Sequence, residues 1–573
     1  MFFFRFFIIS LFVFNVLSNN QKDKTIFISP LKIPVLLSSN FGELRIDHFH
    51  SGLDLKTQGV TGKEVVAAAS GYIYRISVSP GGFGKALYIR HTSGYSTVYG
   101  HLERFSPRIE EYVKNRQYEE KSFLITLFPS KDKFPVNQGE IIAYSGNSGS
   151  SGGPHLHYEI RKSENETPVN PLLFEFGNVD NIKPVIEKLV IYPINHHSFI
   201  NDQNTIKKLD VSGKNGNYFI SSENEIRISG LTGFGIKSFD LMGNSNNRCA
   251  VYSIELKIDS IALFKYIMDG FSFNESRFVN SHIDYEMFQK EKTYIERVFV
   301  LPNDKLSVYQ DVENRGIFNF NDNKSHHIEI IVKDINNNKS VLSFRVKAQT
   351  PRSHNTTAGL NNSFRVMPYN RSNHFETKDI SISIPSGALY DTLSFSYKKI
   401  SGTIEMLSDL HYVHNRFTPV HKAYKLSIKP RIIPTGKESK MLIIQLGDDQ
   451  KKNPVNSTWS DGYLTANVLS FGKFYVGIDN TAPVISPNGL VQGANLTAKK
   501  EIKIKITDDL SGIKSYEPSI DGKWALFEYD QKNNLLVYQF DEKRITRGIK
   551  HNLSLKVTDN KDNINFYNCD FTW

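Results

Sequence analysis

Short runs of alternating apolar and polar residues, separated by turns rich in Asn, Asp and Gly, constrain the fold of this chain most strongly. Examples are EIRISGLTGFGIKSFDLMGN at 225–244 and HHIEIIVKDINNNKS at 326–340. Alternation with a period of two places one face of a strand in a core. Short strands between such turns are typical of β-sandwiches. We therefore expect a mainly β protein.

An internal repeat divides the second part of the chain. DNIKPVI at 180–186 resembles DNTAPVI at 479–485, and IIVKDINNNKS at 330–340 resembles LKVTDNKDNIN at 555–565. We interpret the repeat as two immunoglobulin-like β-sandwich modules, at 179–350 (with an insertion) and 479–573. Between them we expect a linker at 351–376 and a further β-sandwich-like module at 377–478. Turn chemistry explains the Asp and Asn clusters, with Ca²⁺ as the alternative.

Composition excludes some classes of protein. The 573 residues are too many for a single domain. The formal net charge is +10, but no dense basic block accompanies it, so a nucleic-acid partner is not indicated. The two cysteines, Cys249 and Cys569, do not make a disulfide scaffold.

The N-terminus predicts export. Arg5 precedes an apolar run from Phe6 to Leu17, and the small residue Ser18 is followed by polar residues. This is the pattern of a secretory signal peptide, expected at 1–18. The alternative is a membrane anchor, for which the run is short. Since no other stretch is apolar and long enough, we expect no stable membrane span in the mature chain, which would be located in the periplasm or cell envelope.

Three separated segments carry candidate metal ligands. GNSGSSGGPHLHYEI at 146–160 places a glycine-rich loop before His155 and His157, which lie on one face of a predicted strand. His50 and Asp54 lie in HSGLD, and His101 lies in YGHL. Three of these side chains can hold Zn²⁺ and leave a fourth position open, as catalytic zinc requires. The alternative is an ordinary loop and strand.

The ordered set of HSGLD, YGHL and GNSGSSGGPHLHYE resembles the lysostaphin/LytM-type zinc endopeptidases, which cut peptidoglycan. The resemblance covers residues 38–173, and we expect an antiparallel β peptidase domain at 19–178. It implies His50, Asp54 and His157 as zinc ligands and His155 and His101 as the catalytic pair, with His155 preferred as the base.

Neighbouring residues admit two interpretations each. Glu159 is either a hydrogen-bond partner of a ligand or a solvated carboxylate, and Arg45 is a candidate for holding a substrate carboxylate. We expect His48 not to be a ligand, His91 to be structural or to line the substrate, and Tyr99 to line the groove or pack.

Residues 104–133 are an insertion relative to compact members of the family. Ser106 and Pro107 predict a helix start, and Ile109, Tyr112 and Val113 form an apolar stripe. The insertion is either packed on the domain or a lid over the groove.

The sequence thus predicts a secreted zinc metalloendopeptidase that hydrolyses stem-peptide cross-links in peptidoglycan. A D-Ala to diamino-acid bond is preferred, with a glycine bridge as the alternative. The other function class is a non-catalytic wall-binding or amidase-regulating scaffold. The immunoglobulin-like modules are spacers or dock to the wall or to an envelope protein partner.

Overall fold

The computed structural model describes residues 27–174, 180–221, 225–242, 246–350 and 364–573. Strands predominate throughout these residues, which confirms the mainly β prediction. The predicted signal peptide at 1–18 lies outside the described residues. None of the described helices combines the length and apolar character needed to span a membrane.

The N-terminal domain is built on an 11-stranded sheet that carries the predicted ligands. Its central order is β1-β2-β10-β6-β5-β4-β7. The bounds are β1 (Leu37–Ser39), β2 (Leu53–Lys56), β4 (Gly71–Val78), β5 (Lys85–His91), β6 (Tyr95–Phe105), β7 (Ile125–Leu127) and β10 (His155–Lys162). The core beneath the sheet includes Leu55, Ile89 and Leu156. All pairings along this order are antiparallel, so the sheet brings segments 100 residues apart side by side.

The insertion is packed on the domain. Its helix α1 (Pro107–Glu120) begins at the predicted Ser106–Pro107 start, and Ile109 and Val113 are buried in the domain core. After the helix, β7 pairs with β4 and extends the sheet. The lid arrangement is therefore not the one that the structure shows.

The first of the modules predicted to be immunoglobulin-like forms a 13-stranded sheet system. It includes β12 (Val185–Pro193), the long β16 (Ile226–Leu241), β17 (Arg248–Cys249), β23 (Ser325–Lys333) and β24 (Lys339–Ala348). Helices α2 (Val279–His282) and α3 (Tyr285–Glu291) lie within it. Phe41 and Phe49 of the N-terminal domain pack against Phe271 of this module, with ring centroids 5.1 and 5.5 Å apart.

The middle module contains two five-stranded sheets, which pack around one core. The predicted linker at 351–376 is too long at its C-terminal end, because β25 (Arg365–Met367) and β26 (Asn373–Glu376) pair within this module. The polar residues around these two short strands make their alternation of apolar and polar residues hard to recognise in the sequence. Residues 351–363 lie outside the described part.

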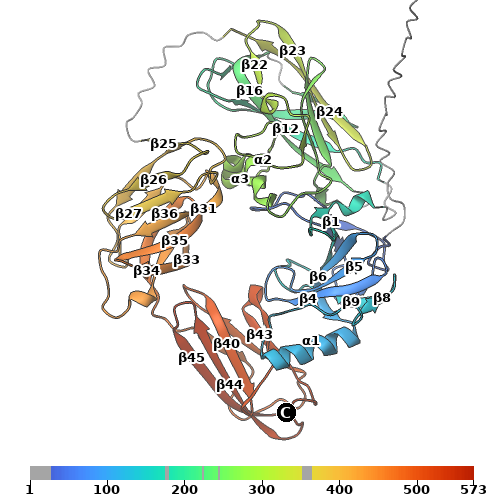
Figure 1. Cartoon of the computed structure of the whole chain (residues 1–573), viewed down its shortest axis with the longest axis vertical. Helices are drawn as coiled ribbons and strands as arrows, with labels where there is room; N and C mark the ends of the chain where they lie inside the picture. Colours follow the sequence, from blue (N-terminus) through green and yellow to red (C-terminus); the bar gives the residue numbers. More distant parts are fainter. Residues whose placement is uncertain (1–26, 175–179, 222–224, 243–245, 351–363) are drawn as a thin grey trace, which may run out of the picture.

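The last module places a four-stranded sheet and a five-stranded sheet around one core. Its strands include β40 (Ile513–Ile520), β42 (Glu528–Asp530), β43 (Leu535–Gln539), β44 (Lys550–Asp559) and β45 (Ile564–Thr572). Cys569 is buried here, whereas Cys249 is buried against the N-terminal domain, and both are free thiols. Figure 1 shows that the chain passes through the modules in order and that the last one returns to α1.

Candidate metal centre

The side chains of His50, Asp54 and His157 converge on one point. Asp54 Oδ1 lies 3.1 Å from His50 Nε2 and 2.9 Å from His157 Nδ1. The two imidazole nitrogens lie 3.1 Å apart. Two nitrogens and one carboxylate oxygen within reach of a single ion form a donor set that suits Zn²⁺. The residues that the sequence predicts as ligands thus fit a zinc ion.

Strand register brings two of these residues together. His157 on β10 is directly opposite Asp54 on β2, and on the other side it is opposite Gly100 on β6. Cross-strand neighbours lie close enough for their side chains to meet on one face. Gly52 is required beside them, because a Cβ there would lie 2.4 Å from the carbonyl oxygen of Tyr158.

Each histidine ligand is oriented by its second ring nitrogen. His50 Nδ1 donates to the carbonyl oxygen of Asn40 at 2.7 Å, which leaves Nε2 free to bind a metal. His157 Nε2 lies 2.9 Å from Glu159 Oε1. Glu159 is fully buried and also pairs with Arg161. Such partners fix the orientation and basicity of a metal-bound imidazole.

The other two predicted histidines stand beside the cluster. His155 Nε2 lies 3.4 Å from Asp54 Oδ1, and the rings of His155 and His101 are 4.8 Å apart. His101 Nδ1 donates to the carbonyl oxygen of Ser148 at 2.9 Å, and His155 Nδ1 donates to that of Gly153 at 2.8 Å. Since a carbonyl only accepts, Nδ1 of each ring is the donor in these bonds, and Nε2 is the ring nitrogen left for other contacts.

The backbone at His101 has a φ of 58°, which is rare for a residue other than Gly. Such conformations cost free energy and persist where the surroundings hold them. This backbone conformation lies within β6, at an irregularity in its pairing with β5, and the His101 ring there packs against those of His155 and His157.

The pKa values of the residues in the site are shifted in different directions. Burial would raise the pKa of Asp54, but the charge of His50 and hydrogen bonds with His155 and His157 hold it well below its usual range. Burial opposes a charge on His157, but Asp54 and Glu159 raise its pKa to about 9. Burial and the neighbouring histidines lower the pKa of His101 to about 3. His101 is therefore neutral at neutral pH and can act as an acceptor at Nε2.

The other residues predicted near the site differ in whether they contact it. His48 is exposed and bonds only its own turn, at the carbonyl oxygen of Ile46. His91 is buried between Ser70 and Thr97. Tyr99 is buried and accepts from the amide of Ala68, so it packs and does not line a groove. Arg45 lies 3.6 Å from Asp54 Oδ2, so its guanidinium stands beside the cluster.

Sequence reasoning missed several residues that shape the site. These are Asn40 and Ser148, whose carbonyls orient histidines, Ser151, whose hydroxyl lies 3.2 Å from His155 Nδ1, and Phe83, whose ring stacks on His157 at 4.8 Å. Ser148 and Ser151 lie in the glycine-rich stretch already singled out. No sequence signal separated Phe83 from core aromatics.

Comparison with known proteins agrees with this geometry. Residues 48–118 and 128–171 match Peptidase family M23. This match includes all five residues of the centre. The N-terminal domain is an M23 peptidase domain.

Curated relatives are similar to this chain over a limited length. An uncharacterized metalloprotease of Haemophilus influenzae is 34% identical over 123 residues, which are 22% of this chain and 20% of the relative. The DD-carboxypeptidase/endopeptidase Mpg of Neisseria meningitidis serogroup B (strain ATCC 13091 / M2091) is 34% identical over 141 residues, which are 24% of this chain and 26% of the relative. The chain thus spans about a quarter or less of these relatives.

Two further matches concern the fold and the modules. The catalytic domain of the M23 protein EnpA from Enterococcus faecalis is 26% identical and covers 25% of this chain and 92% of its own, with a TM-score of 0.19. That score is low, so the assignment of the M23 domain rests on sequence. Residues 364–479 match the Zu5-like domain, which includes the module predicted at 377–478.

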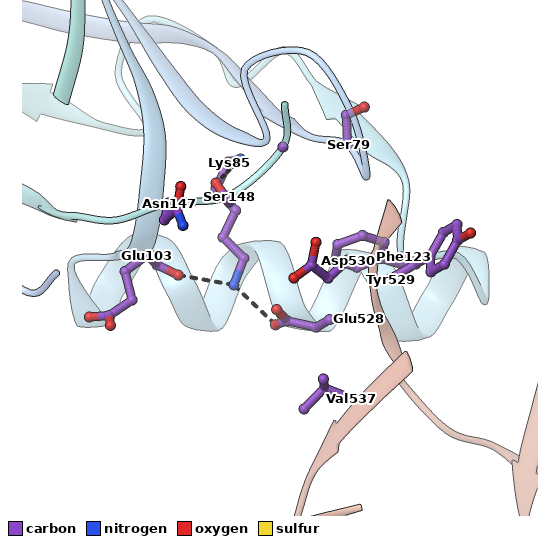
Figure 2. Close-up of a pocket in the computed structure, with 11 residues that line it drawn as sticks. Ser79, Lys85, Glu103, Phe123, Asn147, Ser148, Glu528, Tyr529, Asp530 and Val537 are labelled. Atoms are coloured by element: carbon purple, nitrogen blue, oxygen red, sulfur yellow. Dashed lines mark hydrogen bonds and ion pairs between the residues drawn. The ribbon is translucent and has the colours of Figure 1, made fainter. Parts of the chain in front are cut away.

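The last module docks against the M23 domain next to the centre. Lys532 donates to the carbonyl oxygens of Asn147 and Ser151, in the glycine-rich loop. Figure 2 shows Lys85 of the M23 domain bonded to Glu528 of the last module and to the carbonyl oxygen of Glu103. Lys85, Glu103, Asn147 and Glu528 are among the residues that line a cavity of about 440 Å³ between the two domains.

Helix α1 completes this interface. Lys114 pairs with Asp541 at 2.6 Å, and the Arg544 guanidinium lies 3.9 Å from the ring centroid of Tyr118. Tyr118 also meets Trp524 edge to face, with centroids 5.2 Å apart. The last module therefore packs against the insertion.

Proposed function

We propose that this protein is a zinc metalloendopeptidase that hydrolyses stem-peptide cross-links in peptidoglycan. One observation carries the proposal: the side chains of His50, Asp54 and His157 converge, and beside them stand two histidines whose Nδ1 atoms are held by backbone carbonyls. The name of the Neisseria relatives, DD-carboxypeptidase/endopeptidase, supports a peptide substrate of this kind. A bond between D-Ala and a diamino acid is the preferred target, and a glycine bridge is the alternative.

The protein side chains divide the work as follows. His50, Asp54 and His157 hold the zinc ion, which when bound makes water more acidic and polarises a carbonyl. His155 acts as the base, because its Nε2 faces the ligand cluster and its Nδ1 is held by Gly153. His101 accepts or relays a proton beside it at Nε2. Arg45 holds an anionic group of the substrate.

We place the protein in the periplasm or cell envelope, with the modules as a scaffold toward peptidoglycan or an envelope protein partner. The predicted signal peptide supports this location, and the proposed peptidoglycan substrate agrees with it. A non-catalytic scaffold would not need His155 and His101 beside a complete ligand set, so we prefer the enzyme.

Zymography on purified peptidoglycan tests the proposal. The zinc-loaded protein should clear the wall, whereas chelation or His155→Ala should abolish clearing. His48→Ala is the matched control, because His48 is exposed and does not contact the cluster. Equal clearing by His155→Ala and the parent would refute the assignment.

A further inference from the structure

Three buried carboxylates meet in the first immunoglobulin-like module, away from the histidine centre. Asp180, Asp240 and Asp334 each place a carboxylate oxygen within 4.8 Å of the other two. Their exposed fractions are 5%, 2% and 2%. Removing several like charges from water into one place is costly unless something compensates for them.

Turn chemistry accounts for Asp334. Its Oδ1 accepts from the backbone amides of Asn336 and Asn338 at 2.9 and 2.7 Å, and its Oδ2 accepts from Asn338 Nδ2 at 2.6 Å. This carboxylate is thereby fixed in position by the turn after β23. Its hydrogen bonds explain its own burial but not that of its two neighbours.

The other two carboxylates each keep an oxygen without a partner. Asp180 Oδ1 accepts from the amide of Ile182, but Asp180 Oδ2 is buried and has no hydrogen-bond partner among the described residues. The same holds for Asp240 Oδ1. Buried polar atoms are nearly always partnered in proteins, so these two oxygens indicate a missing ligand.

Within the described ranges, no Lys, Arg or His forms an ion pair with any of the three. Burial and the charges of Asp334 and Asp180 raise the pKa of Asp240 to about 8. The cluster therefore has converging carboxyl oxygens and, among the described residues, no basic partner in an ion pair with it.

We propose that Asp180, Asp240 and Asp334 bind a Ca²⁺ ion. Calcium takes six to eight oxygen ligands in irregular geometry, whereas Mg²⁺ demands near-ideal octahedral geometry and keeps several waters. Zinc prefers nitrogen and sulfur, which this cluster lacks. A buried set of three carboxylates thus suits calcium best.

The repeat unit in the last module provides an internal comparison. Asp559 there accepts from the amides of Lys561 and Asn563, as Asp334 does from Asn336 and Asn338. However, Lys561 takes the place of Asn336; burial lowers the pKa of Lys561, and the charges of Asp479 and Asp559 oppose that lowering. Both oxygens of Asp479 are also hydrogen-bonded. The second cluster, of Asp479, Asp508 and Asp509, thus has a basic group nearby, whereas the first has none in an ion pair with it among the described residues.

The proposed ion lies at the junction with the M23 domain. Asp240 is opposite Cys249 where β16 pairs with β17. The next residue, Ala250, exchanges two 2.8 Å hydrogen bonds with the Asn40 side chain. The carbonyl of Asn40 orients His50, so a short chain of contacts joins the carboxylate cluster to the metal centre.

Calorimetric titration of the zinc-loaded full-length protein with CaCl₂, after passage over a chelating resin, tests the proposal. We expect Asp240→Asn to bind one calcium ion fewer per chain than the parent. Asp508→Asn should still bind the ion held by Asp180, Asp240 and Asp334. Saturating calcium should raise the unfolding temperature by about 5 °C in the parent and not in Asp240→Asn.

A second signature separates an ion site from a merely structural carboxylate. Without calcium, Asp240→Asn should be at least as stable as the parent, because it removes a repelling charge. Asp180→Asn gives the same test if Asp240→Asn fails to fold. Calcium binding that survives both substitutions, an absence of calcium binding by the parent, or tighter binding of Mg²⁺ than of Ca²⁺ would overturn the assignment.

Discussion

Lys532 Nζ donates to the carbonyl oxygen of Ser151 at 2.9 Å, across 381 positions of sequence. The same loop orients both proposed catalytic histidines, through the carbonyl of Ser148 for His101 and the hydroxyl of Ser151 for His155. The last module is therefore connected to the catalytic histidines through one loop. A contact of this kind positions catalytic groups without touching substrate.

Lys532→Ala should lower kcat on a cross-linked muropeptide about fivefold, with zinc content unchanged, because one charge-assisted hydrogen bond contributes on the order of 1 kcal/mol. Lys543→Ala is the control, because that side chain is 81% exposed and its nearest carboxylate, Glu111, lies 3.6 Å away. An increase in kcat would mean that the module obstructs the site instead of positioning its loop.

Glu159→Gln should weaken zinc binding by about 10- to 100-fold, because the charged partner of His157 Nε2 is lost. Competition with a chromophoric chelator measures this affinity. Glu166→Gln is the matched control: Glu166 also contacts Arg161, at 3.3 Å, but it is a partly exposed residue in the turn after β10. Equal affinities in parent and Glu159→Gln would contradict the role given to Glu159.

Gly52→Ala should destabilise the M23 domain by about 1–3 kcal/mol and impair zinc binding, because the added methyl group would overlap the Tyr158 carbonyl oxygen. Gly153→Ala adds the same methyl group where no heavy atom lies within 4 Å. Thermal unfolding and zinc content of the two variants give the comparison. Equal behaviour would show that the backbone yields at Gly52.

The local motifs made the metal centre predictable. HSGLD and HLH place their side chains through short-range geometry, and strand pairing then sets Asp54 opposite His157. Contacts between distant segments carry no such signal. The hydrogen bond from His50 to the carbonyl of Asn40 and those from Lys532 to the carbonyls of the glycine-rich loop form only when the backbone has folded. The meeting of Asp180, Asp240 and Asp334 likewise depends on three segments that are distant in the sequence.

Docking of the last module against the M23 domain should weaken at low pH. Burial would raise the pKa of Asp541, but the hydrogen bond and charge of Lys114 lower it below the ordinary value of 3.8. The pair therefore stabilises docking above pH 3.8, and this contribution is lost as the pH falls through the lower pKa of the docked state. Small-angle scattering should show an unchanged maximum dimension from pH 7 to 5 and an increase only below about pH 4.

Asp541→Asn should remove this acid step, whereas Asp562→Asn should keep it, because Asp562 pairs with Lys514 inside the same module. Circular dichroism at each pH shows that the modules themselves stay folded. Expansion that begins above pH 5 in the parent would assign docking to a different titrating group.

Digestion of a purified cross-linked muropeptide dimer by the zinc-loaded protein, followed by mass spectrometry, tests the proposed peptidase most directly. We predict conversion of the dimer into monomers that gain one water at the D-Ala to diamino-acid bond, with no conversion by His155→Ala at equal zinc content. An intact dimer in the presence of one zinc ion per chain, or equal conversion by His155→Ala, would contradict the proposal.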